Sequence, residues 1–114
     1  MSYNGYTNYE TWVVNLWLDN SECSHDHWIG VAREIYENSA LEPTLGGLGS
    51  NKMQDAAYIL AEKLKNEHEE TKDEILENSK LTSSLWADML GAALSEVNWR
   101  EIAEHFLEYV EVEA

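Results

Sequence analysis

The chain has 114 residues, a common size for one domain and enough to bury one core, so we expect a single domain over residues 1–114. Hydrophobic residues make up 44% of the sequence, and five Trp and six Tyr supply more aromatic surface than a disordered chain carries. The 22 Asp and Glu against seven Lys and Arg give a formal charge of −15. That charge argues against direct binding of nucleic acid and favours basic protein surfaces as partners.

The sequence has no sign of a membrane or secretory segment. No stretch approaches the roughly 20 apolar residues of a membrane span, and residues 1–11 lack the basic and apolar sections of a signal peptide. Cys23 is the sole cysteine, so it cannot form an internal disulfide, which agrees with a reducing compartment. We therefore expect a cytoplasmic protein with no membrane partner, in which Cys23 is structural.

The first half of the chain predicts two helices. Thr7 and Glu10 have the spacing of a capping box, so a helix is expected over residues 8–19. Its apolar face would comprise Tyr9, Trp12, Val13, Leu16 and Trp17. A second helix is expected from Ser24 to residue 39 or 40. Its apolar side would comprise Trp28, Ile29, Ala32, Ile35 and Tyr36.

A glycine-rich segment with the single proline separates these helices from the rest, so residues 41–50 are expected to form the longest loop. Ser50 or Asn51 can cap a third helix whose apolar stripe comprises Met53, Ala57, Leu60 and Leu64. Residues 66–80 are mostly charged. They read either as a continuation of the third helix or as a separate surface helix.

The last third of the sequence predicts two more helices. Ser83 or Ser84 can open a helix, in which Gly91 would permit close approach of a neighbour, with an apolar stripe of Leu85, Trp86, Met89, Leu90, Ala93 and Leu94. Asn98 can cap the final helix, with Glu101 three residues later and an apolar stripe of Trp99, Ile102, Ala103, Phe106, Leu107 and Val110. The predicted fold is therefore all-α, a compact bundle of five or six short helices.

Three residues near the second helix, Cys23, His25 and His27, are of types that bind transition metals. Their spacing matches no established site, because residues two apart share a face on a strand and not on a helix. We interpret them as a polar helix entrance and expect no metal or cofactor.

Two further histidines lie near carboxylates, His68 beside Glu69 and His105 beside Glu104, which are residue types used in acid–base catalysis. The sequence has no zincin pattern, phosphate-binding loop or nucleophile elbow. We therefore expect that the protein is not an enzyme.

Two rows of carboxylates repeat at steps of three and four residues. The 67–77 ridge comprises Glu67, Glu70, Asp73, Glu74 and Glu77. The 101–111 ridge comprises Glu101, Glu104, Glu108 and Glu111. Neighbours on such a helix face are about 5 to 6 Å apart, comparable with phosphates along a duplex strand. The ridges suggest a DNA mimic that occupies a basic groove, although charged helix faces are usually only solvated.

The five tryptophans could line a ligand pocket or stack on bases, but their helical spacing favours the core. Base stacking is disfavoured because phosphates would meet mainly carboxylates. We therefore expect all five to lie in the core and not in a binding site.

Residues 4–12, NGYTNYETW, with Leu16-Trp17-Leu18-Asp19-Asn20, and residues 92–103, AALSEVNWREIA, resemble a family of small acidic proteins encoded by phages and mobile elements. The family is largely uncharacterised, so the resemblance implies a genetic setting and no reaction, ligand or catalytic residue. In such a setting small acidic proteins often inhibit restriction or CRISPR machinery by occupying DNA-binding surfaces.

These observations give a leading hypothesis of a non-enzymatic inhibitor that binds a basic nucleic-acid-binding host protein through the two ridges. The alternative is a small structural or adaptor module whose acidity serves solubility, possible as a homodimer through leftover apolar surface.

Overall fold

The computed structural model describes residues 3–39 and 52–113, with side chains up to residue 110. Within these ranges the helices are α1 (Tyr9–Asn20), α2 (Glu22–Ser39), α3 (Lys52–Asn78), α4 (Leu85–Ser95) and α5 (Trp99–Glu113). The β-structure of the described residues is limited to an isolated antiparallel bridge between Tyr3 and Tyr6. The all-α prediction is confirmed. The loop expected over residues 41–50, and the caps Ser50 and Asn51, lie outside the described residues.

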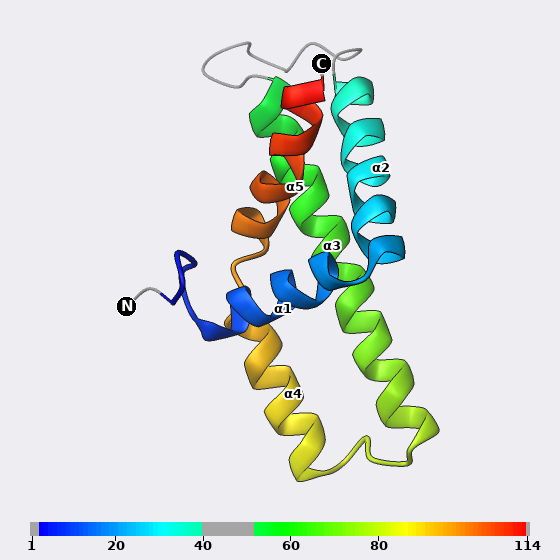
Figure 1. The fold of residues 1–114 in the computed structure, drawn as a ribbon. Coiled ribbons are helices and arrows are strands. Elements are labelled where there is room, and N and C mark those ends of the chain that lie inside the picture. Colours follow the sequence, from blue (N-terminus) through cyan, green and yellow to red (C-terminus); the bar gives the residue numbers. More distant parts are fainter. Residues whose placement is uncertain (1–2, 40–51, 114) are drawn as a thin grey trace.

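The core lies where α2, the first half of α3 and α5 run side by side, with α1 crossing them (Figure 1). Helix α5 contributes one complete face to this core, and Phe106, Ile102 and Leu107 are fully buried. The stripes predicted for α3 and α5 are confirmed, since the buried cluster is Leu18, Trp28, Ala32, Ala56, Ala57, Leu60, Leu64, Val97, Trp99, Ile102, Ala103, Phe106, Leu107 and Val110. Burial of these side chains drives the helices together.

Helix α1 turns a different face inward from the one predicted. Its buried residues are Thr11, Asn15 and Leu18, whereas Tyr9 is 52% exposed and Trp17 is 70% exposed. The predicted apolar face is therefore wrong for α1. The polar face is buried because its side chains hydrogen-bond to the start of α5 and to a histidine cluster, as described below.

The start of α2 differs from the prediction, and the extent of α3 resolves an alternative that the sequence left open. Helix α2 begins at Glu22, two residues before the predicted start at Ser24, because the Ser21 hydroxyl accepts a hydrogen bond from the Ser24 N–H at 3.3 Å and so caps the helix. Residues 66–78 continue α3 without a break. The helix ends in a Schellman motif, in which Lys80 has φ of +60° and the Leu81 N–H bonds to the Leu76 carbonyl at 2.8 Å.

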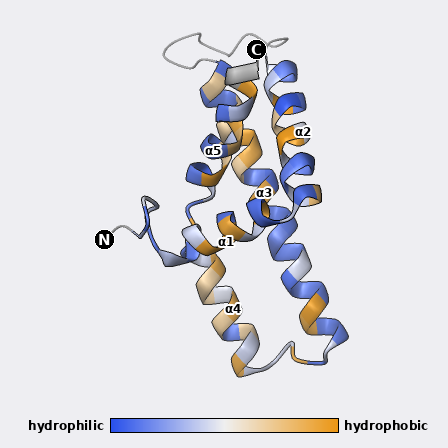
Figure 2. Cartoon of the chain, in the orientation of Figure 1, coloured by the Kyte–Doolittle hydropathy of each residue, from blue (hydrophilic) through white to orange (hydrophobic). Residues whose placement is uncertain are grey.

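Beyond the core, the second half of α3 and helix α4 project together (Figure 1). We call residues 67–95 the arm. Ser84 caps α4 as predicted, accepting from the Ala87 N–H at 3.2 Å, but no residue of α4 is buried. Leu94 packs against the core and is partly buried, but the larger residues of the stripe predicted for α4 are exposed, so that prediction is wrong for most of its residues. A Cβ added at Gly91 would meet nothing within 4 Å. Figure 2 shows α4 as the more hydrophobic partner of a hydrophilic α3 in the arm.

Candidate functional site

The starts of α1 and α5 meet in a hydrogen-bonded cluster that caps both helices at once. Asn8 caps α1, accepting from the Thr11 N–H at 2.9 Å and from the Thr11 hydroxyl at 2.6 Å. Asn98 caps α5 as predicted, accepting from the Glu101 N–H at 3.1 Å. The Thr11 hydroxyl accepts the Asn98 N–H at 2.8 Å, and the Glu101 carboxylate accepts the Thr7 N–H at 2.9 Å. Each helix start is therefore completed by a residue from the other.

This arrangement corrects the capping box predicted from Thr7 and Glu10. The cap of α1 is Asn8, and the carboxylate that accepts the Thr7 N–H comes from Glu101, 94 residues away. The Asn8 side chain also donates to the Glu96 carbonyl at 2.7 Å, which ties the α1 start to the end of α4. The two sequence motifs thus have a structural role, since together they fix α1 against α5.

A second polar cluster joins α1, α2 and α5 at Asp19. His25 Nδ1 lies 3.0 Å from Asp19 Oδ1, and His105 Nε2 lies 3.0 Å from Asp19 Oδ2. The Asn15 side chain donates to Asp19 Oδ2 at 3.1 Å and to the Tyr6 hydroxyl at 2.9 Å. Both imidazoles are therefore held by one carboxylate.

The Tyr6 hydroxyl lies at the edge of this cluster and has a perturbed pKa. Burial raises the pKa of Tyr6 above its ordinary value, and the negative charges of Asp19, Glu101 and Glu108 raise it further, against the opposing hydrogen bond from Asn15. The phenol is therefore held in its neutral form. The cluster binds helices together, and nothing in it supplies a nucleophile next to a free base.

The other residues considered for chemistry are dispersed. Cys23 and His27 are exposed, while His25 contacts Asp19, so these three do not converge. The His68 ring lies between Trp28 and Trp99, with centroid distances of 6.3 and 5.2 Å. Among the described residues, no group of three or more His, Cys, Asp and Glu is arranged to hold a metal ion.

The 101–111 ridge is partly occupied by contacts within the protein. Glu101 is half-buried and accepts the Thr7 N–H, and Glu104 forms an ion pair with Arg100 at 3.1 Å. Glu108 is exposed, and the side chain of Glu111 lies outside the described residues. The structure therefore leaves this ridge with fewer carboxylates available to a partner than its spacing suggested.

The 67–77 ridge follows one face of the arm on a single helix. Glu70, Asp73, Glu74 and Glu77 are exposed, and Glu67 is half-buried. Glu67 pairs with Lys63 at 3.1 Å and Asp73 with Lys72 at 3.4 Å, both at the surface, where such pairs are weak. Among the ion pairs of the described residues, none involves Glu70, Glu74 or Glu77. This ridge is therefore the more available of the two.

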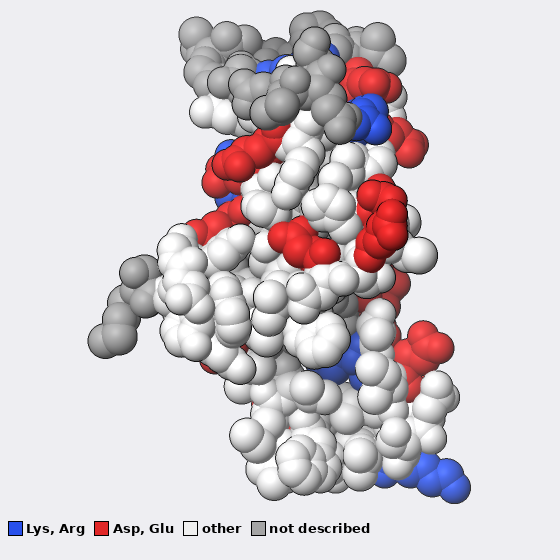
Figure 3. Space-filling view, viewed as in Figure 1, with Lys and Arg blue, Asp and Glu red and all other residues white. Residues whose placement is uncertain are grey.

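The arm also exposes apolar surface that the sequence assigned to the core. Trp86 is 56% exposed and Trp17 on α1 is 70% exposed, so the expectation that all five tryptophans lie in the core is wrong for these two. Trp28 and Trp99 are buried as expected, and Trp12 is half-buried. Figure 3 shows a face with few charges over α1 and α4, while acidic residues follow the right-hand edge, over α2 above and α3 below.

Sequence reasoning missed the Asp19 cluster and the exposed face of α4. Asp19 and His25 fall on different helices, and His105 is 86 residues from Asp19, so only the packing of α1 against α5 brings them together. For α4, the signal was its composition, since Asp88 is its sole charged residue and its apolar residues occupy most of its circumference.

None of the helices in the described residues is long and apolar enough to cross a membrane. No protein-family model matches the chain, and neither a curated protein nor a solved structure is detectably similar to it.

Proposed function

We propose that this protein is a non-enzymatic inhibitor that binds a basic nucleic-acid-binding protein and occupies its DNA-binding surface as an acidic DNA mimic. The observation that carries the proposal is the 67–77 ridge, whose exposed carboxylates lie on a continuous helix that projects beyond the core. A helix presents its charges in a fixed row, so a basic groove would meet them with little further ordering of the chain. The sequence-wide charge of −15 would accelerate the encounter.

The 67–77 ridge supports this role better than the 101–111 ridge. Glu101 is already used by the backbone of Thr7, and Glu104 by Arg100. Binding of a partner by Glu101 would therefore break the cluster that joins the starts of α1 and α5. If residues 4–12 and 92–103 mark a phage or mobile-element protein, the target class we propose is a defence protein, such as a restriction enzyme or a CRISPR effector.

A second candidate function is a small adaptor module whose acidity serves solubility. The exposed apolar residues of α4 favour it, since an interaction surface of that kind needs no charge. The two candidates differ in what the carboxylates do, so charge reversal separates them.

The test compares two charge reversals that change the net charge equally. Glu70→Lys with Glu74→Lys reverses the 67–77 ridge, and Glu104→Lys with Glu108→Lys reverses the 101–111 ridge. Wild type and both variants are used to capture proteins from a bacterial lysate at low and raised salt, and affinities for the captured protein are then measured. We expect a basic nucleic-acid-binding protein to be captured, with affinity about tenfold lower for the first variant only.

Equal affinities for the two variants would contradict a specific role of the 67–77 ridge. Capture of a partner without basic surface, insensitive to salt and to both reversals, would replace the inhibitor with the adaptor function. Thermal melting of each variant controls for folding, because Glu104 contributes a surface ion pair and Glu70 and Glu74 do not.

A further inference from the structure

Helix α4 is oriented against the usual rule for an amphipathic helix. Its large apolar side chains are exposed, and the exposed fractions are 62% for Leu85, 56% for Trp86, 55% for Met89 and 41% for Leu90. The side nearer α3 carries Ala87, and Gly91 has open space around it. A free-standing domain gains by burying its large apolar side chains. The outward face of α4, defined by these four large residues, is therefore a surface suited to a partner.

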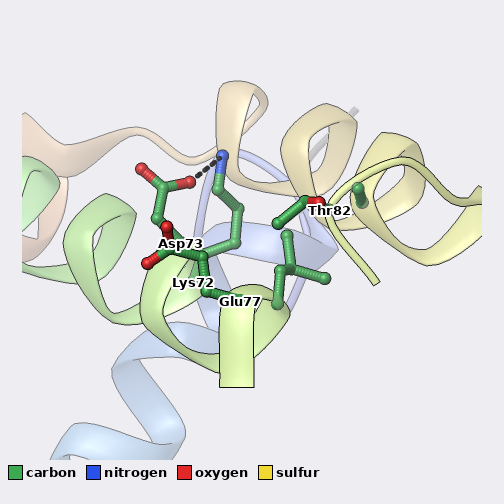
Figure 4. A pocket seen from close by; sticks show the side chains of 6 residues that line it. Lys72, Asp73, Glu77 and Thr82 are labelled. Carbon is green, nitrogen blue, oxygen red and sulfur yellow. Dashed lines mark ion pairs between the residues drawn. The ribbon is translucent and has the colours of Figure 1, made fainter. Parts of the chain in front are cut away.

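A cleft of about 470 Å³ lies between the two helices of the arm. Figure 4 shows Lys72, Asp73 and Glu77 on the α3 side, with the Lys72–Asp73 ion pair dashed, and Thr82 on the other side. Leu76 and Ala87 also line the cleft. Lys72 already pairs with Asp73 there at 3.4 Å, so Glu77 is the lining carboxylate that has no ion pair among the described residues, and the cleft combines apolar walls with this carboxylate. A lysine or arginine side chain of a partner fits this combination, because its methylene groups can contact apolar walls while its cation approaches carboxylates.

The area of the α4 face argues against a second copy of this chain as its occupant. Its four exposed side chains are far fewer than the roughly 20 to 30 residues that each partner contributes to a standard interface. A symmetric dimer would bury only this same face on both copies and would bring together two chains of charge −15. A partner that covers the α4 face and also the 67–77 ridge gains more area and opposite charge.

We infer that the α4 face is the anchoring part of the interface, and that it binds an apolar surface bordered by lysine and arginine on the partner. This inference rests on the proposed function and adds the chemistry of the bound surface. The ridge attracts the basic border and sets the rate of association, while Trp86 and its neighbours supply the contacts that slow dissociation.

The test uses a synthetic helical peptide made only of leucine and lysine, with the leucines on one face and the lysines beside them. An isomer of the same composition has its leucines scattered around the helix. Wild type is expected to bind the amphipathic peptide about tenfold more tightly than the isomer, with amide chemical-shift changes concentrated at residues 81–94. Trp86→Ser with Met89→Ser should remove this preference, whereas the control Tyr58→Ser with Ile59→Ser should keep it.

The control residues are comparably exposed, at 62% for Tyr58 and 48% for Ile59, but lie on the core half of α3. Neither pair is buried, so unchanged melting temperatures verify that both variants fold. Equal binding of the two peptides, or an unchanged preference in the Trp86 variant, would overturn the anchoring role while leaving the ridge proposal intact.

The reversal of Glu70 and Glu74 separates the two ideas in the other direction. If it leaves both peptide affinities unchanged while the Trp86 variant loses its preference, the anchor stands and the proposed function fails. Sedimentation that shows a wild-type dimer, converted to a monomer by the Trp86 variant, would identify a second copy as the occupant and overturn the inference.

Discussion

The hydroxyl of Thr11 offers the most exacting test of how the starts of α1 and α5 are joined. Thr11 is fully buried, and its hydroxyl donates to the Asn8 side chain and accepts the Asn98 N–H. Replacing it in Thr11→Val preserves the branched shape and removes only these polar contacts. Helix propensity changes little, because both residues are β-branched.

The expected loss follows from the partners that remain. The Asn98 N–H loses its acceptor in a partly buried position, which costs about 1–3 kcal/mol, and the bond to Asn8 contributes about 1 kcal/mol more. Asn8 still accepts the Thr11 N–H, so the cap of α1 is weakened and not abolished. We expect Thr11→Val to lower the free energy of unfolding by about 2–4 kcal/mol, and the melting temperature by about 8–16 °C.

Urea denaturation and thermal melting measure this loss directly. The matched control is Thr71→Val, in which the same atoms are removed from an exposed residue whose hydroxyl donates to the Glu67 carbonyl. The control should stay within about 0.5 kcal/mol of wild type. If Thr11→Val lowers the free energy of unfolding as little as the control does, the hydrogen bonds between the starts of α1 and α5 do not stabilise the fold. The structural role inferred for residues 4–12 and 92–103 is then wrong.

Two further predictions concern the cluster at the other end of α1. Asp19→Ala removes the acceptor shared by two imidazoles and an amide, so it should lower the free energy of unfolding, measured by urea denaturation, by about 2–3 kcal/mol. The control Asp73→Ala changes an exposed carboxylate and should lower it by less than about 0.5 kcal/mol. Equal effects of the two changes would show that the cluster is dispensable. The pKa of Tyr6 is raised in the folded protein from 10.0, so its stabilising contribution is present below pH 10 and is lost as the pH rises above it. Stability measured from pH 9 upward should therefore fall more steeply in wild type and in the Tyr58→Phe control than in Tyr6→Phe, and identical slopes in all three would contradict the raised pKa.

Where burial follows helical spacing, the sequence predicted the structure well. The stripe from Trp99 to Val110 forms the core face of α5, and Asn98 caps it, because a regular apolar repeat and a local cap act within one helix. The caps at Asn98 and Ser84 need no knowledge of the rest of the fold. The continuous course of α3 through residue 78 was one of two open alternatives, since charged residues favour neither.

Where burial depends on distant partners, the prediction failed. Helix α1 buries Thr11 and Asn15 because their hydrogen-bond partners are supplied from other segments, Asn98 and Tyr6 among them. Helix α4 has a regular apolar stripe, but its larger residues are exposed, so periodicity alone could not distinguish a core face from an exposed one. Which carboxylates of the 101–111 ridge are available also depends on contacts that the sequence does not reveal. The contact of Thr7 with Glu101 is tertiary, and the ion pair of Arg100 with Glu104 depends on side-chain rotamers.

The central claim is that this protein and DNA compete for one surface. The most direct measurement is an equilibrium competition, in which duplex DNA is titrated into the complex of this protein with the partner captured by the wild-type chain. The account predicts mutually exclusive binding, with apparent affinity falling in proportion to DNA concentration. A ternary complex of the partner with both DNA and this protein would contradict it.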